Sequence, residues 1–437
     1  MNPETMKGIK IEPLCFVHCS DLHLDSPFAG LGETQPDIAE LLKRATFAAF
    51  DRIVDLAVAE RADFIIISGD IYDGADRSLL AQIRFHEGLS RAAEAGIKSF
   101  IAHGNHDPLS GWEAGLVFPP EVYRFGGDRV ESYRVKRDGI DLASVSGISY
   151  SRSKVEENLA LGFKADKKAP FNIGVLHSNL GGDPNHDNYA PCVIDDLISS
   201  GMDYWALGHI HNRAIKRENH PTVVYPGNPQ GRSLRETGPR GCYLVRVDES
   251  GQVTLEFHET DSVRWLIEDI DISDRSTEND LIDRLLSRRD AVRAADHNLG
   301  KILTIRLTGR GALHKALQRP ENIIDITEEM RSGESERKDF VWLDSIRVNT
   351  RPEIDIENRR RMDDFVGDFL KAAERLRRDE NAAARLREFL MSQPGGARIK
   401  SQIENLPESD LYDIVNRAEI EGLNLLLPDE ETGTGAP

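Results

Sequence analysis

The sequence predicts a layered α/β fold, followed by a small α+β cap domain and a helical C-terminal region. Short apolar runs alternate with amphipathic helical patterns through the first half of the chain, which is typical of layered α/β domains. Strand-like alternation becomes denser towards residue 262, and apolar residues recur at helical spacing beyond residue 350. We therefore divide the chain into residues 1–262, 263–350 and 351–437.

The individual elements follow from these patterns in chain order. In the first domain, apolar runs predict strands at 14–19, 64–67, 98–101, 173–176, 204–207, 223–225, 242–245 and 253–258. Helical spacing predicts helices at 41–56, 79–95 and 194–200. Further along, we expect strands at 265–272, 302–307 and 341–348, and helices at 279–295, 358–376 and 409–420. The end of the chain, 429–437, is expected to be disordered.

Composition limits the classes of function. The formal net charge of −19 argues against nonspecific nucleic-acid binding through the overall field, so any DNA contact must be local, metal-assisted or shared with a partner. No apolar run approaches the roughly 20 residues that span a bilayer, and we expect no signal peptide and no membrane partner. The four cysteines contain no C-x-x-C pair, which favours a reduced, cytoplasmic location.

Five polar clusters follow the carboxyl ends of predicted strands, where open α/β sheets bind ligands. They contain Asp21 and His23; Asp70 and Asp73; Asn105, His106 and Asp107; His177; and His209 and His211. Carboxylate, imidazole and amide groups without thiolates suit manganese, iron or zinc. The Asp-x-His and His-x-His spacings aim both side chains of each pair to the same side of an extended backbone. Each pair can therefore serve one metal pocket.

This ordered series, D-x-H, G-D-x-x-D, G-N-H-D, a later H and G-H-x-H, resembles the calcineurin-like metallophosphoesterases. The resemblance implies a metallophosphoesterase sandwich with two divalent ions, expected to be manganese, with iron or zinc as alternatives. Two such ions bind a phosphate, lower the pKa of a bound water and neutralise charge on the leaving oxygen. The resemblance assigns one ion to Asp21, His23, Asp70 and His211, and the other to Asp70, Asn105, His177 and His209, with Asp70 bridging them.

Three more residues are expected to serve the reaction. By the same resemblance, His106 lies beside the substrate phosphate and stabilises the transition state or protonates the leaving group. Asp73 and Asp107 are candidates for orienting a histidine or a ligand by hydrogen bonding.

A narrower resemblance rests on the stretches 20–25, 185–192 and 225–232, which look like those of SbcD-type DNA-repair exonucleases, in their YhaO-like branch. It implies a DNA exonuclease that works with an SMC-like coiled-coil ATPase docked on the face of 362–376. A homodimer is a further expectation, although the sequence does not fix the oligomeric state. Some members of this group carry a histidine where this chain has Asp73.

Other interpretations stay open at this point. The same metal centre supports a small-molecule phosphodiesterase or a phosphoprotein phosphatase, and a scaffold with a structural metal is a third reading. The face of 362–376 is equally well explained as an intramolecular apolar stripe. Arg232 and Arg235 are candidates for phosphate contact or ordinary surface residues, and His186 is a candidate for the metal rim.

Overall fold

The computed structural model describes residues 10–26, 36–74, 77–182, 189–274, 277–296, 299–379, 381–393, 400–404 and 406–427. His186 and the predicted disordered tail at 429–437 lie outside these residues. The chain divides into two compact units. The first comprises 1–268, 285–305 and 325–346, and the second comprises 269–284, 306–324 and 347–437. Because the division passes through the predicted cap domain, the boundaries at 262 and 350 stay predictions.

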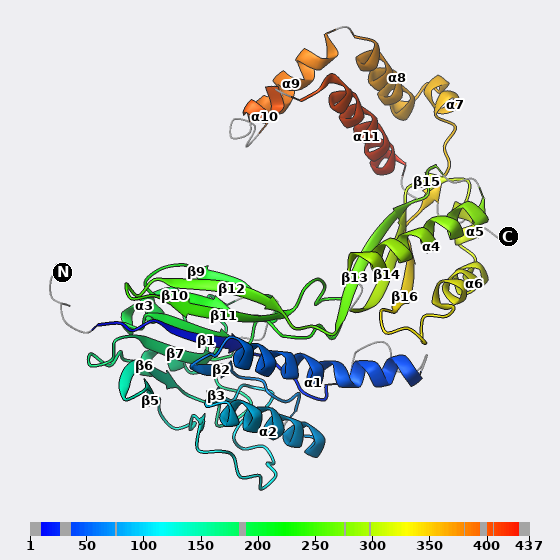
Figure 1. Cartoon of the computed structure of the whole chain (residues 1–437). Helices are drawn as coiled ribbons and strands as arrows, with labels where there is room; N and C mark the ends of the chain where they lie inside the picture. The colour runs from blue at the N-terminus through cyan, green and yellow to red at the C-terminus, as the bar shows by residue number, and fades with distance from the viewer. Residues whose placement is uncertain are drawn as a thin grey trace. The chain divides into compact units, whose positions relative to one another are not determined.

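The first unit is built on two six-stranded sheets (Figure 1). The first sheet has the order β12-β11-β1-β2-β3-β4. Its strands are β1 (Leu14–Cys19), β2 (Phe64–Ser68), β3 (Lys98–Ala102), β4 (Val122–Arg124), β11 (Gly241–Val247) and β12 (Val253–Glu259). Strands β1 to β4 run parallel, while β11 is antiparallel to β1 and to β12.

The second sheet has the order β5-β6-β7-β8-β10-β9. Its strands are β5 (Glu131–Arg137), β6 (Ile140–Gly147), β7 (Asn172–His177), β8 (Tyr204–Gly208), β9 (Ala214–Arg217) and β10 (Thr222–Tyr225). The four central strands β6, β7, β8 and β10 are parallel, and the edge strands β5 and β9 are antiparallel to their neighbours. Parallel strands therefore occupy the middle of both sheets.

Apolar residues fill the space between the two sheets and cover both outer faces. Along β1, Phe16 belongs to the core between the sheets and Val17 to the outer core, as the two-residue period of a strand requires. Helices α1 (Pro36–Ala59) and α2 (Leu79–Glu94) cover the outer face of the first sheet (Figure 1). Helix α3 (Ile194–Ser199) and the 3₁₀ turn η2 (Leu159–Gly162) pack over the second sheet. These four layers confirm the predicted fold class.

The antiparallel pair β5 and β6 was not predicted from the sequence. Strand β5 lies at the sheet edge and carries four charged side chains, of which Lys136 and Arg137 are exposed, so no apolar run marks it. Charged residues on an edge strand discourage pairing with other chains. The charged residues that suit β5 to the sheet edge are therefore also the reason that its sequence contains no apolar run.

A three-stranded sheet follows, in the order β13-β14-β16. Its strands are β13 (Val263–Asp271), β14 (Gly300–Thr308) and β16 (Val341–Val348), accompanied by helices α4 (Glu278–Ala295) and α6 (Pro320–Arg331). Shorter elements are β15 (Arg310–Gly311), β17 (Arg351–Pro352) and α5 (His314–Leu317). Within the first unit, Trp265 and Trp342 pack against Ile38 and Leu42 of α1. This apolar cluster joins the three-stranded sheet to the first domain.

The second unit ends in the helices α7 (Ile356–Arg361), α8 (Phe365–Arg378), α9 (Ala382–Ser392), α10 (Lys400–Glu404) and α11 (Glu408–Leu426). The predicted helical C-terminal region is confirmed, but the helical pattern of 358–376 is divided in two: the Asp364 side chain accepts a hydrogen bond from the Gly367 N–H at 2.8 Å and begins α8. Leu370 packs against Leu423, whereas Phe365 is 72% exposed. In the described part of the chain, no helix is both long and apolar enough to cross a bilayer.

Candidate metal centre

The predicted ligands come from loops at the carboxyl ends of parallel strands in both sheets. Asp21, Asp70 and Asn105 follow β1, β2 and β3 of the first sheet. His177 is the last residue of β7, and the loop with His209 and His211 follows β8 of the second sheet. The two sheets therefore bring together side chains that are as much as 190 residues apart, His211 and Asp21 among them.

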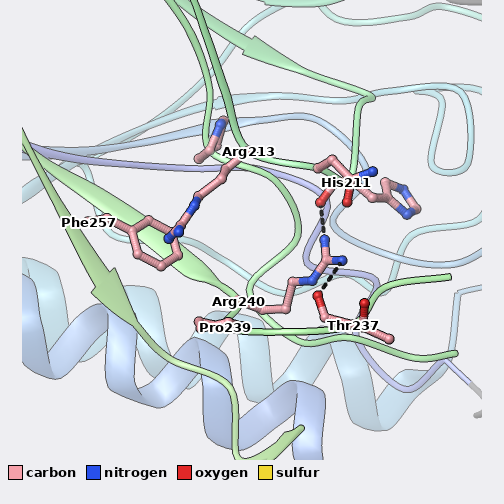
Figure 2. A pocket seen from close by; sticks show the side chains of 8 residues that line it. His211, Arg213, Thr237, Pro239, Arg240 and Phe257 are labelled. Carbon is pink, nitrogen blue, oxygen red and sulfur yellow. Dashed lines mark hydrogen bonds between the residues drawn. The ribbon is translucent and has the colours of Figure 1, made fainter. Parts of the chain in front are cut away.

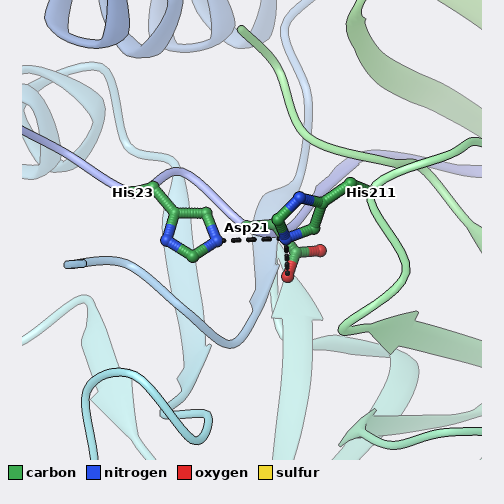
Figure 3. A group of neighbouring side chains, drawn as sticks. All are labelled: Asp21, His23 and His211. Carbon is green, nitrogen blue, oxygen red and sulfur yellow. Dashed lines mark hydrogen bonds and ion pairs between the residues drawn. The ribbon is translucent and has the colours of Figure 1, made fainter. Parts of the chain in front are cut away.

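The first group of ligand atoms belongs to Asp21, His23 and His211 (Figure 3). The Nε2 atoms of His23 and His211 are 3.2 Å apart, and Nε2 of His211 is 3.9 Å from Oδ1 of Asp21. All three ligand atoms lie within 4.8 Å of one another. This is the residue set that the resemblance assigned to one ion, apart from Asp70.

Carboxylates behind these two imidazoles decide which nitrogen faces the centre. Nδ1 of His23 lies 2.8 Å from Oδ1 of Asp73, and Nδ1 of His211 lies 2.7 Å from Oε1 of Glu236. A carboxylate can only accept a hydrogen bond, so a carboxylate beside Nδ1 favours hydrogen on that nitrogen and leaves the lone pair of Nε2 facing inwards. With both lone pairs facing each other at 3.2 Å, a cation between the two Nε2 atoms would be stabilised. The donor set therefore fits a metal.

The pKa values of the two histidines agree with this arrangement. Burial and the positive charge of Arg232 lower the pKa of His23 to about 4, so its imidazole is neutral. Burial also opposes protonation of His211, but the hydrogen bond to Glu236 and the negative charges of Asp21 and Glu236 together outweigh burial and raise the pKa of His211.

The second group comprises Asp21, Asp70 and His177. Nε2 of His177 is 3.3 Å from Oδ2 of Asp70 and 3.0 Å from Oδ1 of Asn105. Its Nδ1 is 3.0 Å from the carbonyl oxygen of Ser68, which can only accept, so Nδ1 carries the hydrogen. Burial disfavours a charged His177, yet the Asp70 carboxylate raises its pKa to about 9. Here too the structure aims Nε2 and the oxygen ligands at a common point.

Asp70 belongs to the second group and also lies near the first, and the resemblance expects it to be a bridging ligand. Its Oδ2 is 3.9 Å from Nε2 of His23 and 3.3 Å from Nε2 of His177. Its Oδ1 accepts a hydrogen bond from the His106 N–H at 2.9 Å. Burial would raise the pKa of Asp70, but the neighbouring His177 holds it well below its ordinary value. Asp70 is therefore a buried anion.

His209 is placed beside the second group by its ring and by its backbone. Its ring centroid is 5.2 Å from that of His177. Its N–H faces the Asp21 carboxylate, at 3.1 Å from Oδ1 and 3.2 Å from Oδ2. This hydrogen bond links the loop after β1 to the loop after β8.

The backbone at the centre adopts an unusual conformation at four predicted ligands. The φ angles are 53° at Asp21, 43° at His23, 52° at Asp70 and 99° at His209. Positive φ is uncommon outside glycine and is found at sites where surrounding structure imposes it. Local sequence does not reveal this feature, which marks the four residues as constrained by the core beneath them.

The close approach of the loops also depends on glycine residues, which have no side chain. A Cβ on Gly104 would lie 2.3 Å from Oδ1 of Asp70, and one on Gly208 would lie 1.9 Å from the carbonyl oxygen of Ser68. Both distances are far below a van der Waals contact. Glycine at 104 lets two loops of the first sheet meet, and glycine at 208 lets the ends of β8 and β2, from the two sheets, meet.

The three residues expected to serve the reaction lie in different environments. His106 is 43% exposed in its side chain, and its Nδ1 is 3.5 Å from Oδ1 of Asp73. Asp107 is fully buried, and its carboxylate accepts hydrogen bonds from the N–H groups of Gly104 at 2.8 Å and Ile71 at 3.1 Å. Asp107 therefore orients the ligand loops and does not face the centre.

Asp73 connects several groups at once. Besides His23 and His106, its Oδ1 accepts from Nη1 of Arg232 at 3.0 Å, and its Oδ2 accepts from the Ser26 hydroxyl at 2.7 Å. Arg232 is a candidate for phosphate contact by sequence, but its side chain is only 15% exposed and pairs with Asp73. The structure gives Arg232 the role of holding Asp73.

Sequence reasoning missed Glu236. Its side chain is 11% exposed and accepts hydrogen bonds from Nδ1 of His211, from Nδ2 of Asn228 at 2.8 Å and from the Arg232 N–H at 2.7 Å. Burial would raise its pKa, but these donors, His211 first, lower it to about 2. No local motif marks this glutamate, because the loop after β10 brings it back to the centre.

Comparisons with known proteins agree with the geometry. Residues 15–213 match the calcineurin-like phosphoesterase profile, and residues 265–351 match the profile of the middle domain of metallophosphoesterase YhaO. The chain is 36% identical over 364 residues to a Bacillus subtilis protein called uncharacterized metallophosphoesterase YhaO, covering 83% of this chain and 87% of that protein.

More distant relatives are named DNA double-strand break repair protein Mre11. The chain is 26% identical over 275 residues to the Methanopyrus kandleri protein, covering 57% of each chain. It is 29% identical over 261 residues to the Aeropyrum pernix protein, covering 55% of this chain and 59% of that one. The match thus spans little more than half of each Mre11 protein.

Proposed function

This chain belongs to the calcineurin-like metallophosphoesterases, in the YhaO group, and on that premise we propose that it hydrolyses phosphodiester bonds in DNA. A metal-dependent phosphoesterase is what the family and the ligand geometry support directly. The step to DNA is supported by one observation: relatives named for DNA double-strand break repair match more than half of this chain. An exonuclease of DNA repair is the form of activity that we propose.

The family uses two divalent metal ions, and the residues at this centre fit them. Asp21, His23 and His211 would hold one ion, Asn105, His177 and His209 the other, with Asp70 between them. When bound, the two ions supply Lewis-acid activation of the phosphate and of a water molecule. We propose manganese, because carboxylate, amide and imidazole ligands without thiolates suit it.

The remaining residues hold protons and orient the ligands. Asp73 keeps hydrogen on Nδ1 of His23, and Glu236 does the same for His211, so both Nε2 atoms stay available. His106 is the exposed polar side chain beside these ligands, with its ring centroid 4.9 Å from that of His23. It is the group placed to protonate a leaving oxygen or to stabilise negative charge.

We also propose an SMC-like coiled-coil ATPase as partner. Phe365 on α8 and Phe389 on α9 are 72% and 59% exposed, which is unusual for large apolar side chains without a partner. The test is co-purification with a coiled-coil ATPase encoded beside this gene. Phe365→Asp should abolish binding and Arg378→Asp, on the same helix, should not; full binding by both variants would reject this surface.

The four free cysteines are consistent with work in the cytoplasm.

A second candidate is hydrolysis of small phosphodiesters or phosphoproteins. The net charge of −19 favours it, because a long polyanion is repelled by an acidic surface. The two candidates differ in substrate size and share one metal centre.

Degradation of end-labelled linear DNA with Mn2+ separates them. We expect degradation that chelator stops, that Asn105→Ala abolishes and that Asn219→Ala retains. Asn105 lies 3.0 Å from His177, whereas Asn219 is exposed in the loop before β10, at the opposite end of the strands. Cleavage of bis(p-nitrophenyl) phosphate without cleavage of any DNA would contradict the nuclease and favour the second candidate.

A further inference from the structure

A cavity of about 220 Å³ lies beside the metal centre and shares His211 with it (Figure 2). Pockets for drug-sized ligands measure roughly 300–1,000 Å³, so this cavity suits one charged group with part of a sugar. Its walls also include Arg213, Arg240, Thr237 and Phe257. Because His211 belongs to both sites, the cavity adjoins the loop that carries a predicted metal ligand.

Arg240 forms a fixed wall of the cavity. It is buried, and its Nη1 donates to the carbonyl oxygen of His211 at 2.5 Å and to Oδ1 of Asn228 at 3.0 Å. Its Nη2 donates to the carbonyl oxygen of Thr237 at 3.2 Å (Figure 2). With these bonds made, Arg240 sets the shape of the cavity and adds positive charge.

Arg213 differs from Arg240 in that its hydrogen-bond donors are not used. Its guanidinium carbon lies 3.9 Å from the centroid of the Phe257 ring, and the side chain is exposed (Figure 2). It makes no hydrogen bond or ion pair with any residue that the structure describes. A guanidinium stacked on an aromatic ring keeps its edge N–H groups available for an anion. The ring therefore holds Arg213 ready to bind.

The charge of the cavity contrasts with that of the chain. Its lining contains two arginines and, among the described residues, no aspartate or glutamate. The whole chain has 74 acidic and 55 basic residues. A wall of one sign beside a catalytic centre concentrates ligands of the opposite sign. The ligand that fits the size, the charge and the flat donor group is a phosphate.

We propose that this cavity is a second phosphate subsite, in which Arg213 binds the phosphate adjacent to the one at the metal centre. The inference rests on the proposed DNA hydrolysis and goes further, because it assigns a site for a phosphate that is not cleaved. The source is the neighbouring nucleotide of the substrate strand. Free inorganic phosphate has the same chemistry and is distinguished by the test below.

The test compares inhibitors of bis(p-nitrophenyl) phosphate cleavage by the manganese-loaded full chain. Thymidine 3′,5′-bisphosphate carries two phosphates on one nucleoside and serves either strand direction, whereas the two thymidine monophosphates carry one. The bisphosphate should bind the natural chain about tenfold more tightly than either monophosphate, since one charge-assisted contact contributes about that factor. Arg213→Ala should remove this advantage, and Phe257→Leu should reduce it.

Arg61→Ala is the matched control. Arg61 is an exposed arginine between α1 and β2, near the amino end of β2 and therefore at the opposite end of the strands from the metal centre, and the variant should keep the tenfold advantage. Equal inhibition by bisphosphate and monophosphates in the natural chain, or an advantage that survives in Arg213→Ala, would overturn the subsite. Inorganic phosphate that inhibits as strongly as the bisphosphate, through Arg213, would overturn the strand as its source. Arg213-dependent selection of the bisphosphate without DNA cleavage would keep the subsite and reject only the nuclease.

Discussion

Replacing Glu236 by glutamine tests whether a buried carboxylate behind His211 sets up the metal centre. The carboxylate accepts from three donors, and the Glu236→Gln amide has only one oxygen to offer them. The NH₂ group of the glutamine can only donate, so where it faces Nδ1 of His211 that nitrogen must accept. The hydrogen of His211 would then move to Nε2, the atom that faces His23. Loss of such a supporting partner typically lowers metal affinity by roughly 10–100-fold.

The pKa of Glu236 gives a second magnitude. It falls from an ordinary 4.5 to about 2 on folding, and each pKa unit is worth about 1.4 kcal/mol, so the charged form contributes ~3 kcal/mol. A lowered pKa gives stability that is complete above pH 4.5 and is lost as the pH falls through about 2. In metal-free protein at pH 7, we therefore expect the free energy of unfolding of Glu236→Gln to be lower by ~3 kcal/mol.

Two assays check these values: calorimetric titration with Mn2+, and urea denaturation in chelator at pH 7 and at several lower pH values. Glu256→Gln is the control, because Glu256 is an exposed partner of Arg246 at 3.2 Å, and exposed pairs contribute at most about 1 kcal/mol. Unchanged metal affinity in Glu236→Gln would refute the reasoning on His211. A stability difference that does not shrink between pH 4.5 and 2 would refute the electrostatic origin.

Three further predictions concern single positions. Gly208→Ala should lower the free energy of unfolding by roughly 1–3 kcal/mol in urea denaturation, because its Cβ would lie 1.9 Å from the Ser68 oxygen; Gly74→Ala, with open space around it, should be neutral. His106→Gln should lower kcat about 100-fold or more while metal affinity measured by titration stays unchanged, and an equal loss of affinity would make His106 a ligand. Metal-free protein should lose stability as the pH rises from 6.5 through about 9, since Asp70 raises the pKa of His177 and the contribution of this pair to stability is complete only below 6.5. Denaturation in chelator across this range measures the loss, which Asp70→Asn should remove.

Local signals explain why much of the fold and the candidate ligands could be predicted. Each of the strands β1, β2, β3 and β8 is a short buried run, and the predicted ligands follow within a few residues. At these strands, the apolar residues that form the core and the polar residues that form the predicted ligands are adjacent in the sequence. The pairing of the ligands into two groups came only from resemblance, and the assignment of each ion stays a prediction.

Features that depend on distant parts of the chain were not predictable. The loop after β10 places Glu236 against His211, and Arg232 donates a hydrogen bond to Asp73, which is 159 residues away in the sequence. The positive φ angles of Asp21 and His209 likewise occur where two loops distant in sequence meet, since the His209 N–H donates to the Asp21 carboxylate. Such features arise from tertiary geometry, which spacing in one sequence does not encode.

The hydrogen bond between Asp21 and the His209 N–H joins loops of two separate sheets, 188 residues apart. Metal ions held by these same two loops would cross-link the two sheets. Such a cross-link closes a long loop of the polypeptide chain. At a free metal concentration 100 times the dissociation constant, binding of one ion raises the free energy of unfolding by about 2.7 kcal/mol. Metal supply in the cell would then govern how long this protein survives as well as how fast it works.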